Sequence, residues 1–182
     1  MITVYTGNGK GKTTSALGAA LAARGNGKKV IMLQFLKGST YSGELTGLYR
    51  LGIPLLQFGV GCRWAAMIRS GFRHCSGCGE CFRDNRNPAL ATEFVQTALR
   101  FLSGLTPAEY DLIILDEVSH ALNYGFLPMD ELRHLLTGPG DWILTGRRMP
   151  EELMPWADEW WEFRAKKHPL TRGIQSRRGI EY

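Results

Sequence analysis

Short apolar runs alternate with segments of helical periodicity along most of this 182-residue chain. The runs are rich in β-branched, aromatic and leucine residues and end at glycine, proline or polar residues, which is the pattern of buried strands. They predict strands at residues 2–5, 28–36, 54–58, 110–115, 142–145 and 159–164. Apolar residues three and four apart predict helices at 14–24, 88–103, 128–136 and 150–157, with weaker helical spacing at 44–51. Strands and helices therefore alternate along the chain.

A glycine-rich segment joins the first predicted strand to the first predicted helix. Its sequence is Thr6-Gly7-Asn8-Gly9-Lys10-Gly11-Lys12-Thr13-Thr14, which matches the P-loop pattern G-x-x-x-x-G-K-[ST] except that the leading glycine comes one residue late. In a P-loop, backbone N–H groups and a helix N-terminus surround phosphate oxygens. Lys12 is then expected to reach the terminal phosphates, and the Thr13 hydroxyl to hold Mg²⁺. A turn that only joins two elements is the alternative, but Gly-Lys-Thr in this context favours a nucleoside triphosphate.

Continuous apolar strands that alternate with helices indicate a parallel sheet covered on both faces. Together with the P-loop, this pattern predicts an α/β fold with a mostly parallel sheet, in the RecA-like architecture of P-loop NTPases. No internal repeat or interdomain linker is visible, so we expect residues 1–182 to form one domain. Residues 59–87 have little periodicity and are expected to form a loop that contains all four cysteines.

Charged residues stand at or just beyond the ends of two of the predicted strands. Asp116 and Glu117 come after the most apolar strand and resemble a Walker B element, in which carboxylates hold Mg²⁺ or orient a reactant. Arg147 follows another strand, where a guanidinium can grip a phosphate. An ordinary soluble strand end and a surface arginine are the alternatives. Because the carboxyl ends of parallel strands share one edge of the sheet, we expect these residues and the P-loop to converge on one crevice.

Composition and charge narrow the classes of function. The chain is 44% hydrophobic and 21% charged with a net charge of +5, and its late basic residues are Arg164, Lys166, Lys167, Arg172, Arg177 and Arg178. No aromatic residues interleave with these charges, so we favour a solvated or triphosphate-holding face over nucleic-acid binding. No apolar run approaches the roughly 20 residues that a membrane helix needs. Met1 leads directly into the first predicted strand, so we expect no signal peptide and a cytoplasmic location.

The cysteines have the spacing of a metal site. Cys75, Cys78 and Cys81 form a C-x₂-C-x₂-C triplet, and Cys62 lies upstream as a candidate fourth ligand. In a reducing compartment this spacing favours a metal over disulfides. Zinc bound by four thiolates and an iron–sulfur cluster are the two candidates, and unliganded thiols in a loop are the alternative.

The P-loop variant resembles that of the ATP:corrinoid adenosyltransferases of the bacterial cobalamin pathway. Further segments of this chain are similar to the same family: Gln34-Phe35-Leu36-Lys37-Gly38, Gln57-Phe58-Gly59 with Gly61-Cys62, Leu115-Asp116-Glu117, Leu144-Thr145-Gly146-Arg147, Lys167-His168-Pro169 and Arg178-Gly179-Ile180-Glu181-Tyr182. The resemblance implies that a cob(I)alamin-type corrinoid attacks the ribose C5′ of ATP and that triphosphate leaves, in cobalamin biosynthesis or salvage.

The resemblance also implies roles for single residues. Lys12, Thr13 and Glu117 are the implied catalytic residues, with Thr13 and Glu117 serving Mg²⁺. The triphosphate would be cradled by Gly7, Asn8, Gly9, Lys10, Gly11, Lys12, Thr13 and Thr14, with Lys10 as a second cation. Where some members have Gly-Phe-Thr-Trp, this chain has Gly61-Cys62-Arg63-Trp64, so Trp64 is either a cover for the lower corrinoid face or a core tryptophan. A homodimer and an electron donor for cobalt are implied as well.

Two other functions are compatible with a P-loop. The first is a phosphotransferase similar to zinc-containing thymidine kinases, in which a carboxylate such as Glu117 would act as the base. The second is a P-loop ATPase that acts as a switch on a protein partner. Both would produce ADP, whereas adenosyl transfer releases triphosphate, so the products distinguish the classes.

Overall fold

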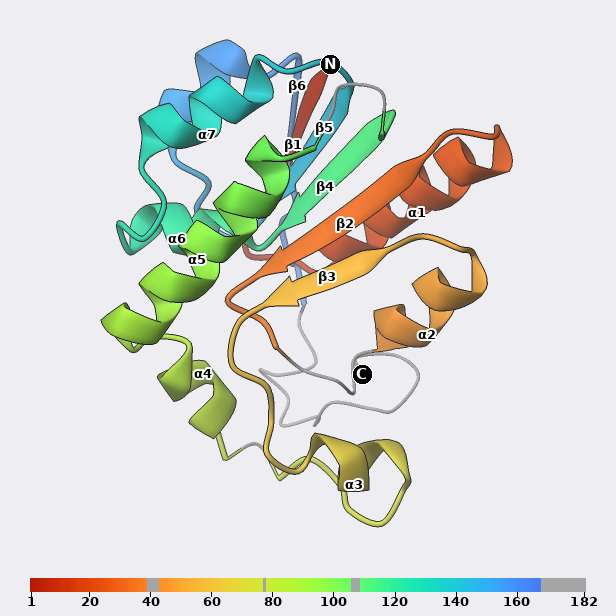
Figure 1. The fold of residues 1–182 in the computed structure, drawn as a ribbon, viewed down its shortest axis with the longest axis vertical. Coiled ribbons are helices and arrows are strands. Elements are labelled where there is room, and N and C mark those ends of the chain that lie inside the picture. The colour runs from red at the N-terminus through yellow and green to blue at the C-terminus, as the bar shows by residue number, and fades with distance from the viewer. Residues whose placement is uncertain (39–42, 77, 106–108, 168–182) are drawn as a thin grey trace.

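The computed structural model describes residues 1–38, 43–76, 78–105 and 109–167. Within these ranges the chain forms a parallel sheet of six strands in the order β3-β2-β4-β5-β1-β6 (Figure 1). The strands are β1 (Ile2–Thr6), β2 (Val30–Phe35), β3 (Leu55–Phe58), β4 (Leu112–Asp116), β5 (Asp141–Thr145) and β6 (Glu159–Glu162). The predicted α/β fold and all six predicted strands are therefore confirmed, with ends that differ by up to two residues.

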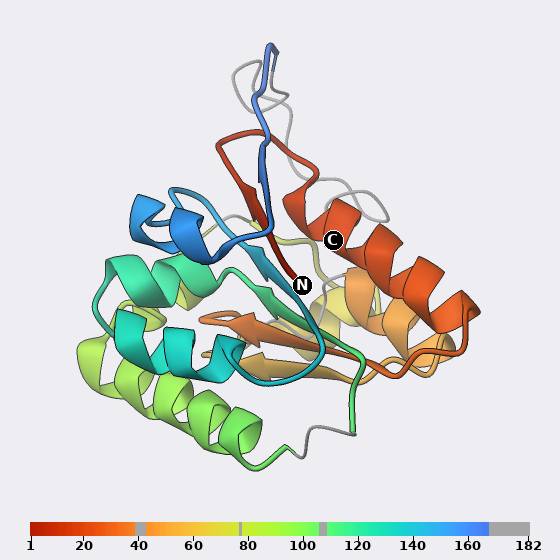
Figure 2. The same cartoon turned by 90° about the horizontal axis from the view of Figure 1, so that it is seen from above.

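Helices cover both faces of the sheet (Figure 2). One face packs against α1 (Lys12–Gly25) and α2 (Gly43–Arg50). The other packs against α5 (Pro88–Ser103), α6 (Val118–Asn123) and α7 (Met129–Leu136). Successive residues of one strand serve opposite faces, because side chains alternate along a strand. Val30 and Met32 of β2 thus belong to the α1 layer, while Ile31, Leu33 and Phe35 belong to the α5 layer.

The predicted helix at 88–103 has the same bounds in the structure, and its start has a clear local cause. The Asn87 side chain accepts a hydrogen bond from the N–H of Ala89 (3.1 Å), and Pro88 occupies the first helical position. An asparagine cap satisfies an N–H that has no partner within the helix, and proline there loses no hydrogen bond. The strength of these two signals explains why this boundary was predictable.

Other elements differ from the sequence-based expectation. Within 59–87 the chain forms two short helices, α3 (Ala65–Arg69) and α4 (Glu80–Asp84), where only a loop was predicted. The helix α6 was not predicted, because six residues are too few to display a helical period. The predicted helix at 150–157 is a 3₁₀ helix, η1 (Glu151–Trp156), which contains a proline.

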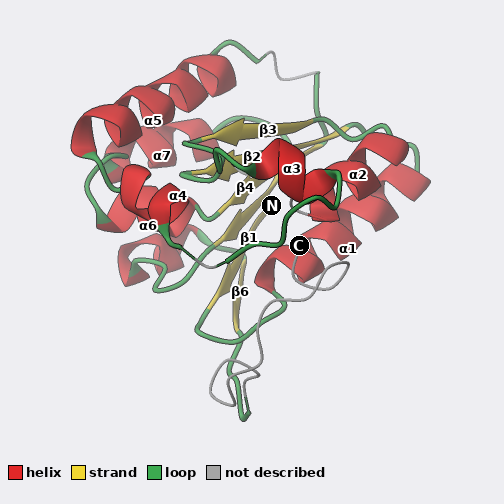
Figure 3. Ribbon diagram, turned by 90° about the horizontal axis from the view of Figure 1, so that it is seen from below, coloured by secondary structure: helices red, strands yellow, loops and turns green. Residues whose placement is uncertain are grey.

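All six strands run in the same direction, so their carboxyl ends lie at one edge of the sheet. The helices α3 and α4 lie beyond this carboxyl edge (Figure 1, Figure 3). Open parallel sheets bind ligands outside this edge, which makes it the place to look for a site. No helix in the described ranges is both long and apolar enough to cross a bilayer.

Candidate nucleotide-binding site

The P-loop connects β1 to α1 at the carboxyl edge, and its lysine is held inside the loop. Lys12 is the first residue of α1, and its ammonium donates hydrogen bonds to the carbonyls of Gly7 and Gly9, both 2.8 Å away. Burial lowers the pKa of Lys12 below its ordinary value; the charge of Glu117 opposes this shift and that of Arg147 adds to it. The lysine, the acidic residue and the arginine predicted for the site therefore lie within electrostatic reach of one another.

The loop packs against the chain that follows β6. The N–H of Gly9 donates to the carbonyl of Phe163 (2.7 Å), and the Phe163 ring meets the Tyr5 ring edge-on with centroids 5.7 Å apart. Gly7 has a φ of 102°, and a β-carbon there would overlap the Phe163 backbone. Glycine is required at this position by both conformation and space. The contribution of Phe163 was not predicted, because its contacts join positions more than 150 residues apart in the chain.

Asp116 connects three strands and the P-loop through buried hydrogen bonds. It is fully buried, and its Oδ1 accepts from the hydroxyls of Thr13 (2.8 Å) and Thr145 (2.6 Å). Its Oδ2 accepts from the amide of Gln34 (3.0 Å), whose carbonyl accepts from Gln57 (2.8 Å). The Asp116 carboxylate thus orients the hydroxyl predicted to hold Mg²⁺. Gln34 and Thr145 were missed, although a glutamine inside an apolar strand is a usable signal.

The next residue, Glu117, has a different environment. Its backbone is left-handed with a φ of 58°, and its N–H donates to the Thr145 hydroxyl (3.1 Å). Its Oε2 is buried and lies 3.1 Å from Nδ1 of His120, yet accepts no hydrogen bond of normal geometry from the described residues. Burial alone would raise the pKa of Glu117, but His120 and Lys12 outweigh it and hold this pKa below its ordinary value. The carboxylate is therefore ionised at neutral pH with one oxygen short of a partner.

The pKa of Asp116 is shifted in the opposite direction, because burial dominates there. Burial raises the pKa of this carboxyl above its ordinary value, although the charge of Lys37 and the hydroxyls of Thr145 and Thr13 favour the ionised form. Of the two neighbouring carboxylates, Asp116 is engaged in three buried hydrogen bonds, whereas the Glu117 side chain contacts His120 and could also hold a cation.

Replacing Thr145 with valine is expected to destabilise the chain by about 1–3 kcal/mol. Valine keeps the shape but leaves Asp116 Oδ1 and the Glu117 N–H each without the buried hydroxyl. ATP affinity should fall as well, because both the Thr13 hydroxyl and Glu117 lose their positioning. Urea unfolding and calorimetric ATP titration measure the two effects.

Thr97→Val is the matched control, since the Thr97 hydroxyl bonds only its own helix at an exposed position of α5. It should change stability by less than about 0.5 kcal/mol. A Thr145→Val protein with unchanged stability and ATP affinity would show that the Asp116 network does not support the site.

Arg147 and its glycine neighbour follow β5 at the same edge. Gly146 has a φ of 151°, and a β-carbon there would collide with the side chain of Ser119 at the start of α6. A glycine is therefore needed for the β5 loop to approach this helix. Arg147 is exposed beyond it, which leaves its guanidinium available for a ligand.

Trp64 lies outside the main core. It precedes α3, is half-buried, and carries the guanidinium groups of Arg73 and Arg63 at 4.2 and 5.7 Å from its ring centre. Cations at this distance are attracted to an aromatic face. In the described chain it belongs to neither of the two buried apolar clusters, which favours the interpretation as a covering residue over that as a core tryptophan.

The structure does not show the predicted cysteine metal site directly. None of the four cysteines forms a disulfide. Across the described ranges, no three Cys, His, Asp or Glu side chains lie together in a group that could hold a metal ion. The similar segments from residue 168 onward, and Arg172, Arg177 and Arg178, lie outside the described residues.

Comparison with known proteins shows the family of the chain. Residues 1–182 match the family model described as ATP:corrinoid adenosyltransferase BtuR/CobO/CobP. The chain belongs to this family. The corrinoid adenosyltransferase of Escherichia coli K12 is 32% identical over 185 residues, which cover all of this chain and 85% of that protein. CobA of Salmonella typhimurium LT2, also named a corrinoid adenosyltransferase, has the same identity and coverage. That of Pseudomonas aeruginosa PAO1 is 29% identical over 187 residues, covering all of this chain and 83% of the relative.

Membership of the adenosyltransferase family agrees with the resemblance found in segments along the whole sequence. In this chain the lysine of the P-loop, Lys12, is hydrogen-bonded to the loop backbone and lies within the electrostatic influence of Glu117. The Thr13 hydroxyl is hydrogen-bonded to Asp116. Neither a thymidine-kinase-like phosphotransferase nor an ATPase switch is favoured by these comparisons.

Proposed function

We propose that this chain transfers the 5′-deoxyadenosyl group of ATP to the cobalt of a reduced, cob(I)alamin-type corrinoid and releases triphosphate. The observation that carries the proposal is the full-length family match in a chain whose Lys12 and Thr13 are set at the carboxyl edge beside Asp116 and Glu117. In this reaction cobalt(I) supplies an electron pair to C5′, a cobalt–carbon bond forms, and the C5′–oxygen bond breaks. The electron pair of that bond leaves with the triphosphate, and no proton moves.

The residues of the P-loop suit a reaction whose leaving group gathers negative charge. Amides of the loop from Gly7 to Thr14, other than that of Gly9, would surround the phosphates, with Lys12 as a buried cation and Arg147 and Lys10 as exposed ones. Charges that are already in position stabilise a developing anion without reorganisation. No side chain needs to act as a general base, because the cobalt nucleophile carries no proton.

Mg²⁺ fits the same edge. The buried Glu117 Oε2, ionised and short of a hydrogen bond, and the Thr13 hydroxyl are oxygen ligands of the kind Mg²⁺ prefers. Bound with ATP, the ion would neutralise part of the triphosphate charge. Asp116 would serve this site indirectly by holding the Thr13 hydroxyl in place.

The corrinoid would lie against the segment after β3. Trp64, half-exposed beyond the carboxyl edge, would cover its lower face, with Cys62 in the place where some members have phenylalanine. Cobalt must arrive reduced, so an external electron donor is part of the proposed reaction. A reducing cytoplasm is the compartment in which that chemistry and free thiols are compatible.

Product analysis tests the proposed reaction. The protein is incubated anaerobically with Mg-ATP and a chemically reduced corrinoid, and phosphorus NMR and visible spectra are recorded together. We expect triphosphate and the light-sensitive cobalt–carbon bond to appear in equal amounts. ADP in place of triphosphate would overturn the proposal in favour of phosphotransfer or ATP hydrolysis.

A homodimer is expected from the family resemblance. Sedimentation equilibrium at micromolar concentration should give twice the chain mass of 20.3 kDa. A single species at the chain mass would contradict this expectation without affecting the proposed chemistry.

A further inference from the structure

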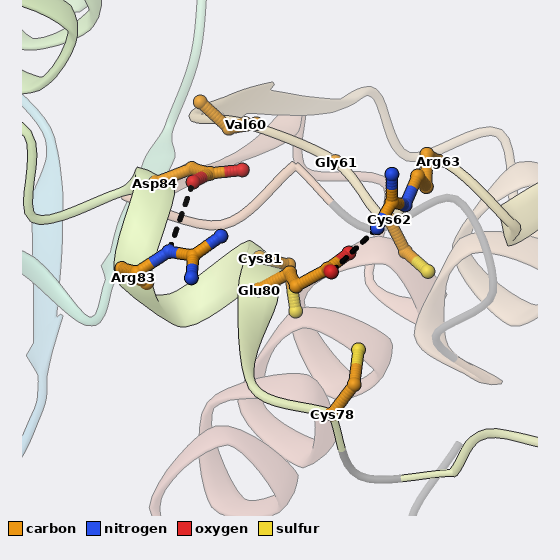
Figure 4. Close-up of a pocket in the computed structure, with 9 residues that line it drawn as sticks. All are labelled: Val60, Gly61, Cys62, Arg63, Cys78, Glu80, Cys81, Arg83 and Asp84. Atoms are coloured by element: carbon orange, nitrogen blue, oxygen red, sulfur yellow. Dashed lines mark hydrogen bonds and ion pairs between the residues drawn. The ribbon is translucent and has the colours of Figure 1, made fainter.

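Three of the four cysteines line one pocket away from the P-loop. The pocket has a volume of about 230 Å³ and lies between α4 and the segment that follows β3. Its lining includes Cys62 from that segment and Cys78 and Cys81 around the start of α4. Figure 4 shows the thiols of Cys78 and Cys81 directed toward one another, with Cys62 across the pocket. Cys62 thus shares one pocket with Cys78 and Cys81, which follow it by 16 and 19 positions in the sequence.

Polar contacts hold the two walls of this pocket in register. Asn85 is buried, and its Oδ1 accepts from the N–H of Val60 (2.7 Å). Its Nδ2 donates to the carbonyls of Val60 (3.0 Å) and Cys81 (2.7 Å). On the surface, Arg63 and Glu80 form an ion pair of 2.5 Å between the same two segments (Figure 4). These contacts therefore hold the two walls of the pocket next to one another without any disulfide.

The chemistry of the lining suits a thiophilic metal. Thiolates bind zinc and iron–sulfur clusters, and the C-x₂-C-x₂-C spacing is found in both kinds of site. The charged side chains of the lining balance one another, because Arg63 pairs with Glu80 and Arg83 pairs with Asp84.

The spacing of the thiols limits how a metal would be held. In the part of the chain that the structure describes, no three ligands are grouped tightly enough for an ion. A single zinc ion would thus have to draw α4 and the Cys62 segment together. A cluster of several iron and sulfide atoms would need less closure, because its own atoms fill space between the cysteines.

We propose that Cys62, Cys78 and Cys81 bind a thiophilic metal centre, zinc or an iron–sulfur cluster, that fastens α4 to the segment following β3. The proposal rests on the pocket and is independent of the adenosyl-transfer reaction. Cys75, the first residue of the triplet, does not line the pocket and is not one of the proposed ligands.

The position of the pocket gives such a centre a structural consequence. Trp64 is two residues beyond Cys62, and the backbone of Gly59 and Gly61 packs so closely against Gly38 that a β-carbon on any of them would overlap the other chain segment. Gly38 follows the carboxyl end of β2, so the cysteine segment is tied to the edge that carries the P-loop. Metal binding would therefore fix Trp64 relative to that edge.

Metal analysis of the anaerobically purified full chain tests the proposal, alongside the variants Cys62→Ser, Cys78→Ser and Cys81→Ser. We expect close to one centre per chain in the parent protein. One zinc and a colourless solution, or iron with acid-labile sulfide and broad visible absorption, would both support the site and would distinguish the two metals. Each serine variant should lose most of the metal, whereas Ser76→Ala in the same loop should keep it.

A second measurement protects the test against variants that fail to fold. Chelator-treated parent protein should exchange the backbone amide of Val60 and those of α4 faster than the metal-bound form, while β4 stays protected. A metal-free anaerobic protein whose four thiols all react with an alkylating agent would overturn the proposal. So would a Cys78→Ser protein that retains the metal of the parent.

Discussion

Replacing Lys12 with alanine is expected to lower adenosyl transfer by at least about 10²-fold while leaving the fold intact. The side chain is 6% exposed, and its ammonium is the cation at the centre of the loop. Removing it leaves the departing triphosphate without a positioned charge. Turnover is measured at saturating ATP and reduced corrinoid, with thermal unfolding as the check on the fold.

Lys28→Ala is the matched control for this variant. Lys28 is an exposed lysine that pairs with Asp141 (3.4 Å) at the opposite, amino end of the sheet. Its loss removes the same charge far from the proposed site and should leave turnover unchanged. Near-normal turnover of Lys12→Ala at saturating substrates would show that the glycine-rich segment is not a working P-loop.

The pH dependence of ATP binding gives a second readout of Lys12. Burial lowers the pKa of its ammonium, so in the free protein this group loses its proton at a lower pH than an ordinary lysine. ATP binds the protonated form, so affinity should fall as the pH rises through this lowered pKa. The alanine variant should lack that decline, which a purely structural role of Lys12 would not produce.

The centre of the sheet was predictable from sequence because β2, β4 and β5 are buried on both faces. Their apolar runs, such as Leu112–Asp116, need no knowledge of the partner strands to be recognised. The P-loop and helix α5 were equally local, since each is defined by residues within one turn or cap. The predictable features are those that are determined by residues close together in the sequence.

The arrangement around Asp116 could not be predicted in the same way. Its partners Thr13, Gln34 and Thr145 come from α1, β2 and β5, and only the strand order brings them together. The left-handed backbone of Glu117 is also invisible in the sequence, because non-glycine residues rarely adopt it. These are long-range or strained features, and they lie at the proposed site.

In the cysteine segment, too, the local pattern was predictable and the long-range contacts were not. The triplet was recognisable by spacing, but the tie through Asn85 joins positions 25 residues apart and leaves no local pattern. The structure also changes which cysteines are the candidate ligands, since Cys62 lines the pocket and Cys75 does not.

Replacing Glu117 with glutamine is expected to raise the Mg²⁺ concentration needed for half-maximal turnover by at least about 10-fold. Glutamine keeps the size of the side chain and the backbone bond to Thr145, but it removes the negative charge next to the Thr13 site. A neutral amide oxygen is a weaker ligand for a hard cation than a carboxylate. Turnover is followed across a Mg²⁺ titration at fixed ATP, with calorimetry of Mg-ATP binding in parallel.

Two further variants separate charge from structure at this position. Glu131→Gln removes an exposed carboxylate on α7 and should leave the Mg²⁺ requirement unchanged. His120→Ala removes the imidazole 3.1 Å from Glu117 but keeps the carboxylate, so it should retain most of the Mg²⁺ affinity. If Glu117→Gln needed no more Mg²⁺ than the parent while His120→Ala needed more, the cation would depend on the imidazole. The assignment of Glu117 as the ligand for Mg²⁺ would then be wrong.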